Sequence, residues 1–438
     1  MRFRPPAGLR PLTGRAAGFL ACAVALYLAG LLTGVRELFM LAVGALALPL
    51  GAWLIVRAGR ARVTATRAVR PARVTAGGKI AVSVELRNPG RMESGVLLVS
   101  DRVPYQLGPS ARFVVAGLPS GATERLGYEL TGVARGRYQL GPTSLRLSDP
   151  FDLASVTVTS GATTEVIVRP RVEALSRVPS AGDLAAAPVS RTRRLTTAGD
   201  ELYTTREYRD GDDLRKVHWR SSAKRGQLMI RQDESPRQAR VLIALDLRAS
   251  VHVGGDEHSS LERVISAGAS IATRLATGGY EIGCVTDDGG TVRVPRRADA
   301  AGPILDFLAG AGPSRSSTLG PLASRLTATS GEGLLIAVIA VPTAEEASAL
   351  ARARPSFGGA LALLVRTDTW LPTPVPGAGA FERPRGAADT AEANTAAAIG
   401  RLGRAGWETA VLRRGEPLEP VWRQLLRARS RAPAGGAR

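Results

Sequence analysis

The chain has 438 residues, of which 45% are hydrophobic and 22% are charged. This length allows two or three domains with cores of their own, and the apolar fraction excludes a chain that is disordered throughout. Its 58 basic and 38 acidic residues give a net charge of +20, which permits binding to anionic lipid or to nucleic acid. Because no nucleic-acid-binding motif accompanies the charge, we expect a membrane rather than nucleic acid to explain it.

Two apolar runs without charges, residues 16–35 and 38–56, lie near the N-terminus and are each long enough to cross a bilayer as a helix. Basic residues flank the pair on both sides: Arg2, Arg4, Arg10 and Arg15 before it, and Arg57, Arg60, Arg62, Arg67 and Arg70 after it. By the positive-inside rule both flanks face the cytoplasm. We therefore predict a two-pass protein of the cell (inner) membrane with the bulk of the chain in the cytoplasm. The alternative is a pair of buried core helices.

The next region, residues 61–170, has the period of two that is typical of β-strands. Residues 80–86 alternate apolar and more polar side chains, and Asn88-Pro89-Gly90 then turns the chain. Further short strands are expected at 96–99, 113–115, 126–130, 145–147 and 166–168. Repeated strands with Gly and Pro turns predict a small β-sandwich. It contains no recognisable catalytic constellation, so we interpret it as a spacer or interaction module.

Residues 171–198 are rich in Ala, Ser, Pro and Arg and are interpreted as a linker. The segment that follows, residues 199–235, packs charges of both signs around Tyr203, Tyr208 and Trp219. Its first part favours a strand at 202–208, and Asp210-Gly211 favours a turn. Asp212 or Asp213 is placed to cap a short helix that runs through Trp219, and residues 228–231 suit a second strand.

His218 is the one histidine of this segment and the candidate for acid–base chemistry, with Glu207, Asp212 and Asp213 available to orient it. No Ser or Cys nucleophile is placed by a recognisable motif. These carboxylates can instead form ion pairs with Arg206, Arg215 and Arg225, which would leave none to orient the histidine. We therefore assign no catalytic residue and expect the segment to bind a partner protein.

From residue 236 to 430, strand-like runs alternate with helical ones. Strands are expected at 241–245, 280–286, 334–341, 360–365 and 409–412, and helices at 304–308, 344–353, 390–405 and 417–429. Ser259 and Glu262 form a capping box that opens another helix, which Gly278-Gly279 end. The alternation predicts a doubly wound, mostly parallel sheet. Residues 431–438 are expected to be a disordered tail.

The segment resembles the signature of the domain of unknown function 58 family. The matching residues are Arg206-Glu207-Tyr208, Gly211-Asp212-Asp213, Arg215, His218-Trp219, Ala223-Lys224-Arg225-Gly226 and Leu228, with Arg135-Gly136-x-Tyr138 and Asp149-Pro150-Phe151 earlier in the chain. The resemblance implies a membrane-anchored bacterial protein whose C-terminal half is similar to a von Willebrand A domain. It also implies a MoxR-type AAA+ ATPase as partner, because such ATPases are often encoded beside these proteins. It implies no reaction.

Ligands of doubly wound sheets bind at the carboxyl ends of the strands, where Asp246 lies. Asp246-x-Arg248-x-Ser250 falls where von Willebrand A domains carry the Mg²⁺-binding Asp-x-Ser-x-Ser. A hard cation needs several oxygen ligands, and only Asp246, Ser250 and either Thr286 or Asp287 are available. Arg248 adds a fixed cation. We therefore expect no metal and no cofactor, with Arg248 paired to Asp246. Binding of Mg²⁺ at the degenerate candidates Asp246 and Ser250 is the alternative.

The loop after this strand carries His252, Asp256, Glu257 and His258. Such residues can bind zinc, but their position around Gly254-Gly255 favours a solvated loop.

The predicted fold class is therefore multidomain: two transmembrane helices within residues 1–60, a small β-sandwich, and a von Willebrand A-like doubly wound α/β domain. The predicted function is that of a cytosol-facing adaptor or scaffold working with a MoxR-type AAA+ ATPase, with other membrane or envelope proteins as further partners. Two alternatives remain open. One is a hydrolase or transferase using His218 with nearby carboxylates, and the other is an envelope-assembly scaffold independent of an ATPase.

Overall fold

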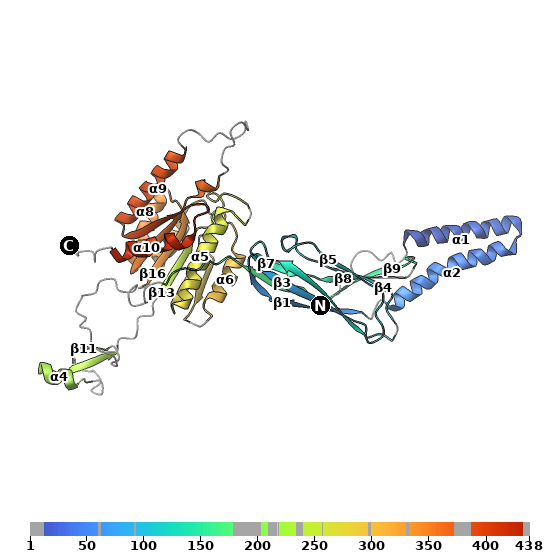
Figure 1. Ribbon diagram of the computed structural model, residues 1–438, viewed down its shortest axis with the longest axis horizontal. Coiled ribbons are helices and arrows are strands. Elements are labelled where there is room, and N and C mark those ends of the chain that lie inside the picture. The colour runs from blue at the N-terminus through green and yellow to red at the C-terminus, as the bar shows by residue number, and fades with distance from the viewer. Residues whose placement is uncertain are drawn as a thin grey trace. The chain divides into compact units, whose positions relative to one another are not determined.

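In the computed structural model the described residues are 13–59, 63–91, 93–149, 151–177, 203–208, 217, 219–233, 240–255, 257–296, 299–329, 333–371 and 387–431 (Figure 1). The chain forms two compact units. The first comprises the residues up to Arg171 together with Leu305–Ala311, and the second comprises Val172–Ile304 together with the residues from Gly312 onward. Most of the predicted linker and nearly all of the predicted tail lie outside the described residues.

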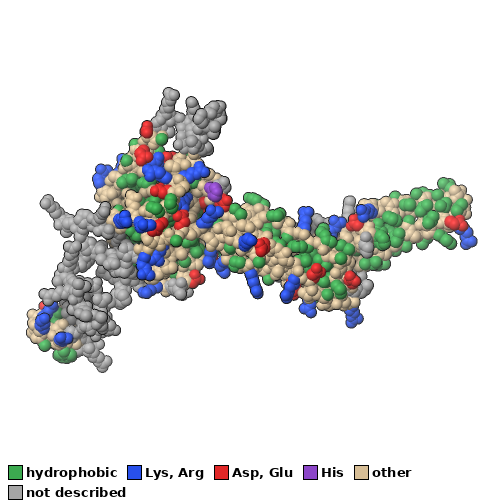
Figure 2. Space-filling model, in the orientation of Figure 1, with side chains coloured by type: hydrophobic (Ala, Val, Ile, Leu, Met, Phe, Trp, Pro, Cys, Tyr) green, Lys and Arg blue, Asp and Glu red, His purple; other side chains and the backbone are tan. Residues whose placement is uncertain are grey.

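Two apolar helices, α1 (Gly14–Thr33) and α2 (Arg36–Gly59), open the first unit as the sequence predicts. Thr13 caps α1, and Gly34 ends it at φ 72°, a backbone conformation that glycine adopts without strain. Only 17% and 22% of their most apolar stretches are buried, which differs from helices in the core of a soluble protein. Figure 2 shows hydrophobic side chains along both helices. Both are long and apolar enough to cross a membrane.

The rest of the first unit is built from three small sheets. The strands are β1 (Thr64–Arg70), β2 (Arg73–Thr75), β3 (Lys79–Arg87), β4 (Val96–Asp101), β5 (Ala111–Val115), β6 (Thr123–Thr131), β7 (Gly136–Leu140), β8 (Thr143–Ser148), β9 (Ser155–Ser160) and β10 (Thr164–Arg169). Their orders are β1-β3-β6, β2-β10-β7 and β5-β4-β8-β9. All neighbouring pairs are antiparallel except β2 with β10. The six predicted strands are confirmed, and β1, β2, β7 and β9 are additional.

Strand β3 connects the two cores of this β region. Val84 and Leu86 pack with Leu97 of β4 and Leu145 of β8 in one core. Inward-facing residues nearer the start of β3 pack with strands β7 and β10 in the other core. Side chains of one sheet therefore share cores with both other sheets, which gives the layered arrangement expected of a sandwich.

The second unit contains a six-stranded sheet in the order β15-β14-β13-β16-β17-β18. The strands are β13 (Arg240–Leu245), β14 (Glu281–Thr286), β15 (Thr291–Val294), β16 (Leu334–Ala340), β17 (Gly359–Val365) and β18 (Trp407–Leu412). All neighbouring pairs are parallel except β14 with the edge strand β15. The order reverses at β13, which pairs with β14 on one side and β16 on the other. The predicted doubly wound, mostly parallel sheet is thus confirmed.

Helices cover both faces of this sheet. They are α5 (Ser260–Thr277), α6 (Ala301–Gly310), α7 (Gly320–Ala328), α8 (Ala344–Ala353), α9 (Ala387–Arg404) and α10 (Leu418–Arg431). Helices α7, α8 and α9 share one core with Ala337 of β16. On the other face, a Cβ at Gly268 of α5 would lie 2.7 Å from Leu245 of β13. A larger residue at position 268 would have to displace the buried Leu245 side chain, so glycine permits this close packing of α5 on β13. Of these helices, α7 was not predicted.

The segment Val172–Arg177 lies against the α/β unit, although it falls within the predicted linker. The backbone N–H of Glu173 donates to Ser270 of α5 over 2.9 Å, and the Glu173 carboxylate pairs with Arg263 and accepts from the N–H of Leu418 over 2.8 Å. Arg263 belongs to α5, and Leu418 is the first residue of α10. Glu173 therefore ties the start of this unit to two of its helices.

Candidate functional site

Part of the predicted partner-binding segment forms a two-stranded hairpin with a short helix. Strands β11 (Tyr203–Glu207) and β12 (Met229–Asp233) are antiparallel, with Arg206 opposite Ile230 and Glu207 opposite Met229. These two strands confirm the sequence prediction. Gly211, Asp212, Asp213, Arg215 and His218 lie outside the described residues, so their predicted roles stay predictions.

The helix of the hairpin differs from the prediction. Helix α4 spans Trp219–Arg225 and begins where the predicted helix was expected to end. Val217 instead forms a β-bridge to Ile230, because its branched side chain suits an extended backbone and is 92% buried there. Gly226, at φ 67°, follows α4 in the left-handed conformation that ends helices.

The outer surface of the hairpin combines an aromatic side chain with basic ones. Trp219 is 71% exposed, whereas Met229 and Ile230 are buried. Arg220, Lys224 and Arg225 of the same helix are also exposed. An exposed tryptophan with neighbouring arginines is a composition that protein interfaces favour.

The second group of predicted residues lies at the carboxyl edge of the six-stranded sheet, where the strand order reverses. Asp246 directly follows β13, and its backbone N–H donates to Val338 of β16 over 3.1 Å. Its carboxylate also accepts from the N–H of Ala340, at the end of β16, over 3.2 Å. Asp246 therefore lies between the carboxyl ends of β13 and β16, the position at which doubly wound sheets bind their ligands.

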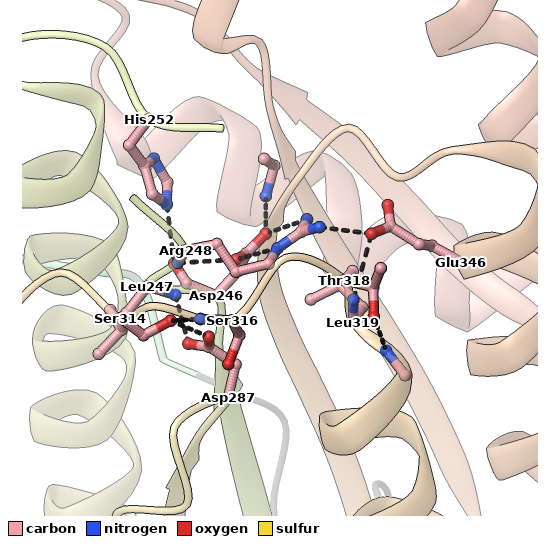
Figure 3. Close-up of polar contacts among 12 residues, drawn as sticks. Asp246, Leu247, Arg248, His252, Asp287, Ser314, Ser316, Thr318, Leu319 and Glu346 are labelled. Atoms are coloured by element: carbon pink, nitrogen blue, oxygen red, sulfur yellow. Dashed lines mark hydrogen bonds and ion pairs between the residues drawn. The ribbon is translucent and has the colours of Figure 1, made fainter. Parts of the chain in front are cut away.

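Arg248 lies between Asp246 and Glu346 at this edge of the sheet (Figure 3). Its Nε and Nη2 atoms donate to the two carboxylate oxygens of Asp246, each over 2.8 Å, and its Nη1 donates to Glu346. The predicted pairing of Arg248 with Asp246 is thus confirmed. Arg248 is 1% exposed and Asp246 is fully buried. Burial by itself would lower the pKa of Arg248, but the hydrogen bonds and charge of Asp246, followed by those of Glu346, outweigh it and raise the pKa.

Glu346 connects the arginine to two helix N-termini. It lies in the first turn of α8, where it forms a capping box with Thr343. Besides the bond from Arg248, its carboxylate accepts from the N–H of Leu319 over 3.1 Å and from the N–H of Thr343 over 3.0 Å. Leu319 and Thr343 precede α7 and α8, whose N-terminal dipoles favour a negative charge. Glu346 is not among the residues predicted from the sequence, although the Thr343-x-x-Glu346 capping pattern after a buried strand is a usable signal.

Asp287 supports the loop that carries Arg248. Its carboxylate accepts from the backbone N–H of Leu247 over 2.8 Å and from the hydroxyl of Ser314. Asp287 is 1% exposed, and both carboxylate oxygens have donors. Ser314 was not foreseen. Of the other candidate metal ligands, Ser250 is exposed and Thr286 donates to Asp288 and Gly290 instead of facing Asp246.

The predicted solvated loop is confirmed at Gly254, Gly255 and His258, which are exposed, whereas Asp256 lies outside the described residues. His252 differs from the prediction, because its side chain belongs to this cluster. One ring nitrogen lies 2.8 Å from the carbonyl oxygen of Asp246 and the other lies 3.0 Å from Ser260 Oγ. Burial lowers the pKa of His252, and the nearby Arg248 cation lowers it further, against the opposing effect of Asp246. His252 is therefore a neutral, hydrogen-bonded side chain at neutral pH. Because a carbonyl only accepts, its Nε2 carries the proton.

The cluster Asp246–Arg248–Glu346 has the chemistry of a structural element. Each of its carboxylate oxygens accepts at least one hydrogen bond, and the guanidinium is a permanent cation that cannot take up or release a proton near neutral pH. Among the residues that the structure describes, no three His, Cys, Asp or Glu side chains form a group that could hold a metal ion. The guanidinium occupies the position where a cation would meet Asp246.

Solved structures that resemble this chain cover only part of it, and their TM-scores are low. One is the CARDB domain of a Pyrococcus furiosus protein in complex with di-metal ions, at 17% identity and a TM-score of 0.19, covering 24% of this chain and 86% of that one. Another is a non-cellulosomal cohesin from Archaeoglobus fulgidus, at 15% identity and a TM-score of 0.18, covering 25% and 91%. Such low TM-scores define neither fold nor function for this chain.

Comparison with curated protein sequences gives no match. A family model does match, over residues 204–321, and its description is "Protein of unknown function DUF58". The matched residues begin in β11 and end in α7, so they include the exposed Trp219 and the buried Asp246, Arg248, Asp287 and Ser314. Residues 204–321 of this chain therefore match the DUF58 family, as the resemblance of the signature segment predicts.

Proposed function

We propose that this chain is a membrane-anchored adaptor, whose α/β unit and hairpin bind a partner protein instead of carrying out a reaction. The observation that carries the proposal lies at the switch point of the sheet. There Arg248 is buried between Asp246 and Glu346 and satisfies both carboxylates. Because the protein's own cation occupies this position, we infer that the α/β unit functions through its outer surfaces and not through a ligand bound at the switch point.

The proposal includes a von Willebrand A-like character of the α/β unit. Supporting features are the strand order, the antiparallel edge strand β15 and an aspartate at the carboxyl end of the first strand. In this proposal Arg248 replaces the metal of such domains with an internal ion pair. Recognition then relies on protein surface without a bridging cation.

The partner that the family resemblance implies is a MoxR-type AAA+ ATPase, and we place its contact on the hairpin. Trp219 is the side chain best suited to anchor it, because it is large, 71% exposed and flanked by cationic residues of α4. The basic residues of α4 would steer an acidic surface toward the tryptophan.

Replacing Trp219 by alanine is expected to weaken partner capture about 30-fold or more, since loss of a central aromatic anchor costs about 2 kcal/mol or more. The measurement is a pull-down of the full chain from native membranes, with the co-purified proteins quantified by mass spectrometry. Tyr105→Ala is the matched control, because Tyr105 is 87% exposed but lies in the β region. Equal recovery of an AAA+ ATPase by the Trp219→Ala chain and the wild type would exclude the hairpin as its binding site.

The proposed location is the cell (inner) membrane, with α1 and α2 as spans and both units in the cytoplasm. The support is the length and apolar surface of the two helices and the basic residues on both flanks. Protease added to inverted membrane vesicles should digest both units. Protection of the α/β unit in intact inverted vesicles, together with its digestion after detergent is added, would reverse the orientation.

A further inference from the structure

The turn between β8 and β9 lies against the base of the helical hairpin. Thr13 donates from its backbone N–H to the carbonyl of Leu153 over 2.9 Å, and from its hydroxyl to the carbonyl of Asp152 over 2.6 Å. Leu153 and Ala154 also pack with Ala16 of α1 and with α2. The turn therefore meets the first residues of α1 and the last turns of α2, at the end of the hairpin where the chain leaves the apolar helices.

This turn is held in one conformation by Asp149. Its carboxylate accepts from the backbone N–H groups of Phe151 over 2.9 Å and of Ala154 over 2.6 Å. Asp152 has a φ of 54°, a left-handed conformation that is uncommon outside glycine. With its polar backbone paired in this way, the turn presents Phe151 outward, at 67% exposure. Phe151 lies in one lining with Phe19 and Leu48 of the helices, so it belongs to a contiguous apolar surface, which marks an interaction site more often than a single exposed side chain does.

A groove of about 600 Å³ runs from this turn along the helices. It is lined by Arg15, Gly18, Phe19, Cys22, Leu48, Phe151 and Leu153. Arg15 is the one charged residue of this lining, and it lies at the base of the hairpin. The distance along α1 from Arg15 to Cys22 is about 10 Å at the usual helical rise. The groove is thus apolar along its length and cationic at one end.

The charges around the cationic end favour an anion. Asp152 lies 3.9 Å from Arg15 and 3.7 Å from Arg146, and the side chains of both arginines are about half exposed or more. The carboxylate of Asp152 is thus shared by two arginines, while that of Asp149 is buried and bonded to backbone N–H groups of the turn. At these lengths the ion pairs are loose, so either guanidinium can turn toward a phosphate without breaking a buried contact.

We propose that this base groove binds an anionic phospholipid of the surrounding bilayer, with one acyl chain along Phe19 and Leu48 and its phosphate at Arg15. Phe151 closes the groove from the side of the β region and enters the interfacial layer of the membrane. The inference rests on α1 and α2 spanning the membrane, and it adds a third membrane contact contributed by the β region. The lipid surface would then hold that region at a fixed depth.

The depth of Phe151 can be measured with spin labels on the full chain in phosphatidylcholine–phosphatidylglycerol nanodiscs. In a Cys22→Ala background the remaining cysteine, Cys284, is buried, and burial raises its thiol pKa to about 12, so it does not react. We expect a label at Phe151→Cys to be relaxed more by oxygen than by a water-soluble nickel complex, and a label at Tyr105→Cys to show the reverse. Equal, aqueous behaviour at both positions would overturn the proposal.

A label at Val24→Cys, in the middle of α1, separates this outcome from failure of the membrane span. An apolar signature at Val24 with an aqueous one at Phe151 would contradict the base groove alone. An aqueous signature at Val24 would contradict the span, and the base groove with it.

The headgroup is tested by Arg15→Gln, whose side chain is 70% exposed and should leave folding intact. We expect this variant to retain several-fold less phosphatidylglycerol than the wild type through purification from mixed membranes, with phosphatidylcholine unchanged. Arg112→Gln, an exposed arginine on β5, should retain as much as the wild type. Equal retention of phosphatidylglycerol by the Arg15→Gln and Arg112→Gln chains would remove Arg15 from the site and overturn the lipid assignment.

Discussion

Replacing Arg248 by methionine is expected to destabilise the α/β unit by about 3–5 kcal/mol, the cost of removing one partner of a buried ion pair. Methionine fills much of the volume but leaves Asp246 and Glu346 buried with only backbone donors. Domains have a free energy of unfolding of about 5–15 kcal/mol, so the loss is a large share of the total. Urea denaturation of the full chain in detergent, followed by tryptophan fluorescence, measures it, since Trp370, Trp407 and Trp422 lie in this unit.

Two further variants show whether the unpaired charge is the cause. Arg423→Met breaks the exposed pair with Glu419 on α10 and should cost about 0.5 kcal/mol or less. Combining Arg248→Met with Asp246→Asn and Glu346→Gln removes the buried negative charges and should recover part of the stability. If Arg248→Met costs no more than Arg423→Met, the cluster does not stabilise the fold.

The second large effect is expected in the β region, for Asp101→Asn. Asp101 is fully buried and pairs with Arg67, whose side chain is 3% exposed. Arg67 Nε donates to Asp101 Oδ2 over 2.9 Å, and Tyr128 donates to the same oxygen over 2.5 Å. Burial, together with the hydrogen bond and charge of Asp101, raises the pKa of Tyr128, so this hydroxyl keeps its proton. Without the carboxylate, the guanidinium is a buried cation that lacks a counter-charge.

The expected loss for Asp101→Asn is again about 3–5 kcal/mol. The β region contains no tryptophan, so the measurement is hydrogen–deuterium exchange of peptides from β1 and β4 in the full chain. Glu85→Gln is the matched control, because the Arg125–Glu85 pair joins neighbouring strands at the surface, with side chains 78% and 39% exposed. That change should cost about 1 kcal/mol or less. Similar exchange in the two variants would show that the Arg67–Asp101 pair contributes little.

Arg67 also explains why strand β1 could not be predicted from the sequence. Ala65, Arg67 and Val69 face inward on β1, so a charged residue interrupts the apolar alternation that identifies a half-buried strand. The partner that neutralises Arg67 lies on β4, which local sequence cannot reveal. In contrast, β16 and β17 are continuous apolar runs of strand length next to Gly or Pro, and their positions are predicted to within a residue or two.

The candidate site shows the same division between local and long-range information. The position of Asp246 at the end of a buried strand and its pairing with Arg248 two residues later are local, and the sequence predicts both. Glu346 is 98 positions from Arg248, and it meets the arginine only because β16 lies beside β13 and α8 begins at the same edge. The contact between Arg248 and Glu346 depends on the reversed strand order, so it cannot be predicted from a local sequence pattern.

Calorimetric titration of the full chain with Mg²⁺ tests most directly whether Arg248 takes the place of a metal at the switch point. The wild type should give no saturable heat, whereas Arg248→Ser, which removes the cation from the carboxylates of Asp246 and Glu346 and adds a hydroxyl oxygen beside them, should bind Mg²⁺. Arg248→Met removes the same cation but fills its space with an apolar side chain that offers no oxygen ligand, and it should not bind Mg²⁺. Saturable micromolar binding to the wild type that disappears in Asp246→Ala would contradict the account, because a guanidinium held by Asp246 leaves that carboxylate no capacity for a metal ion.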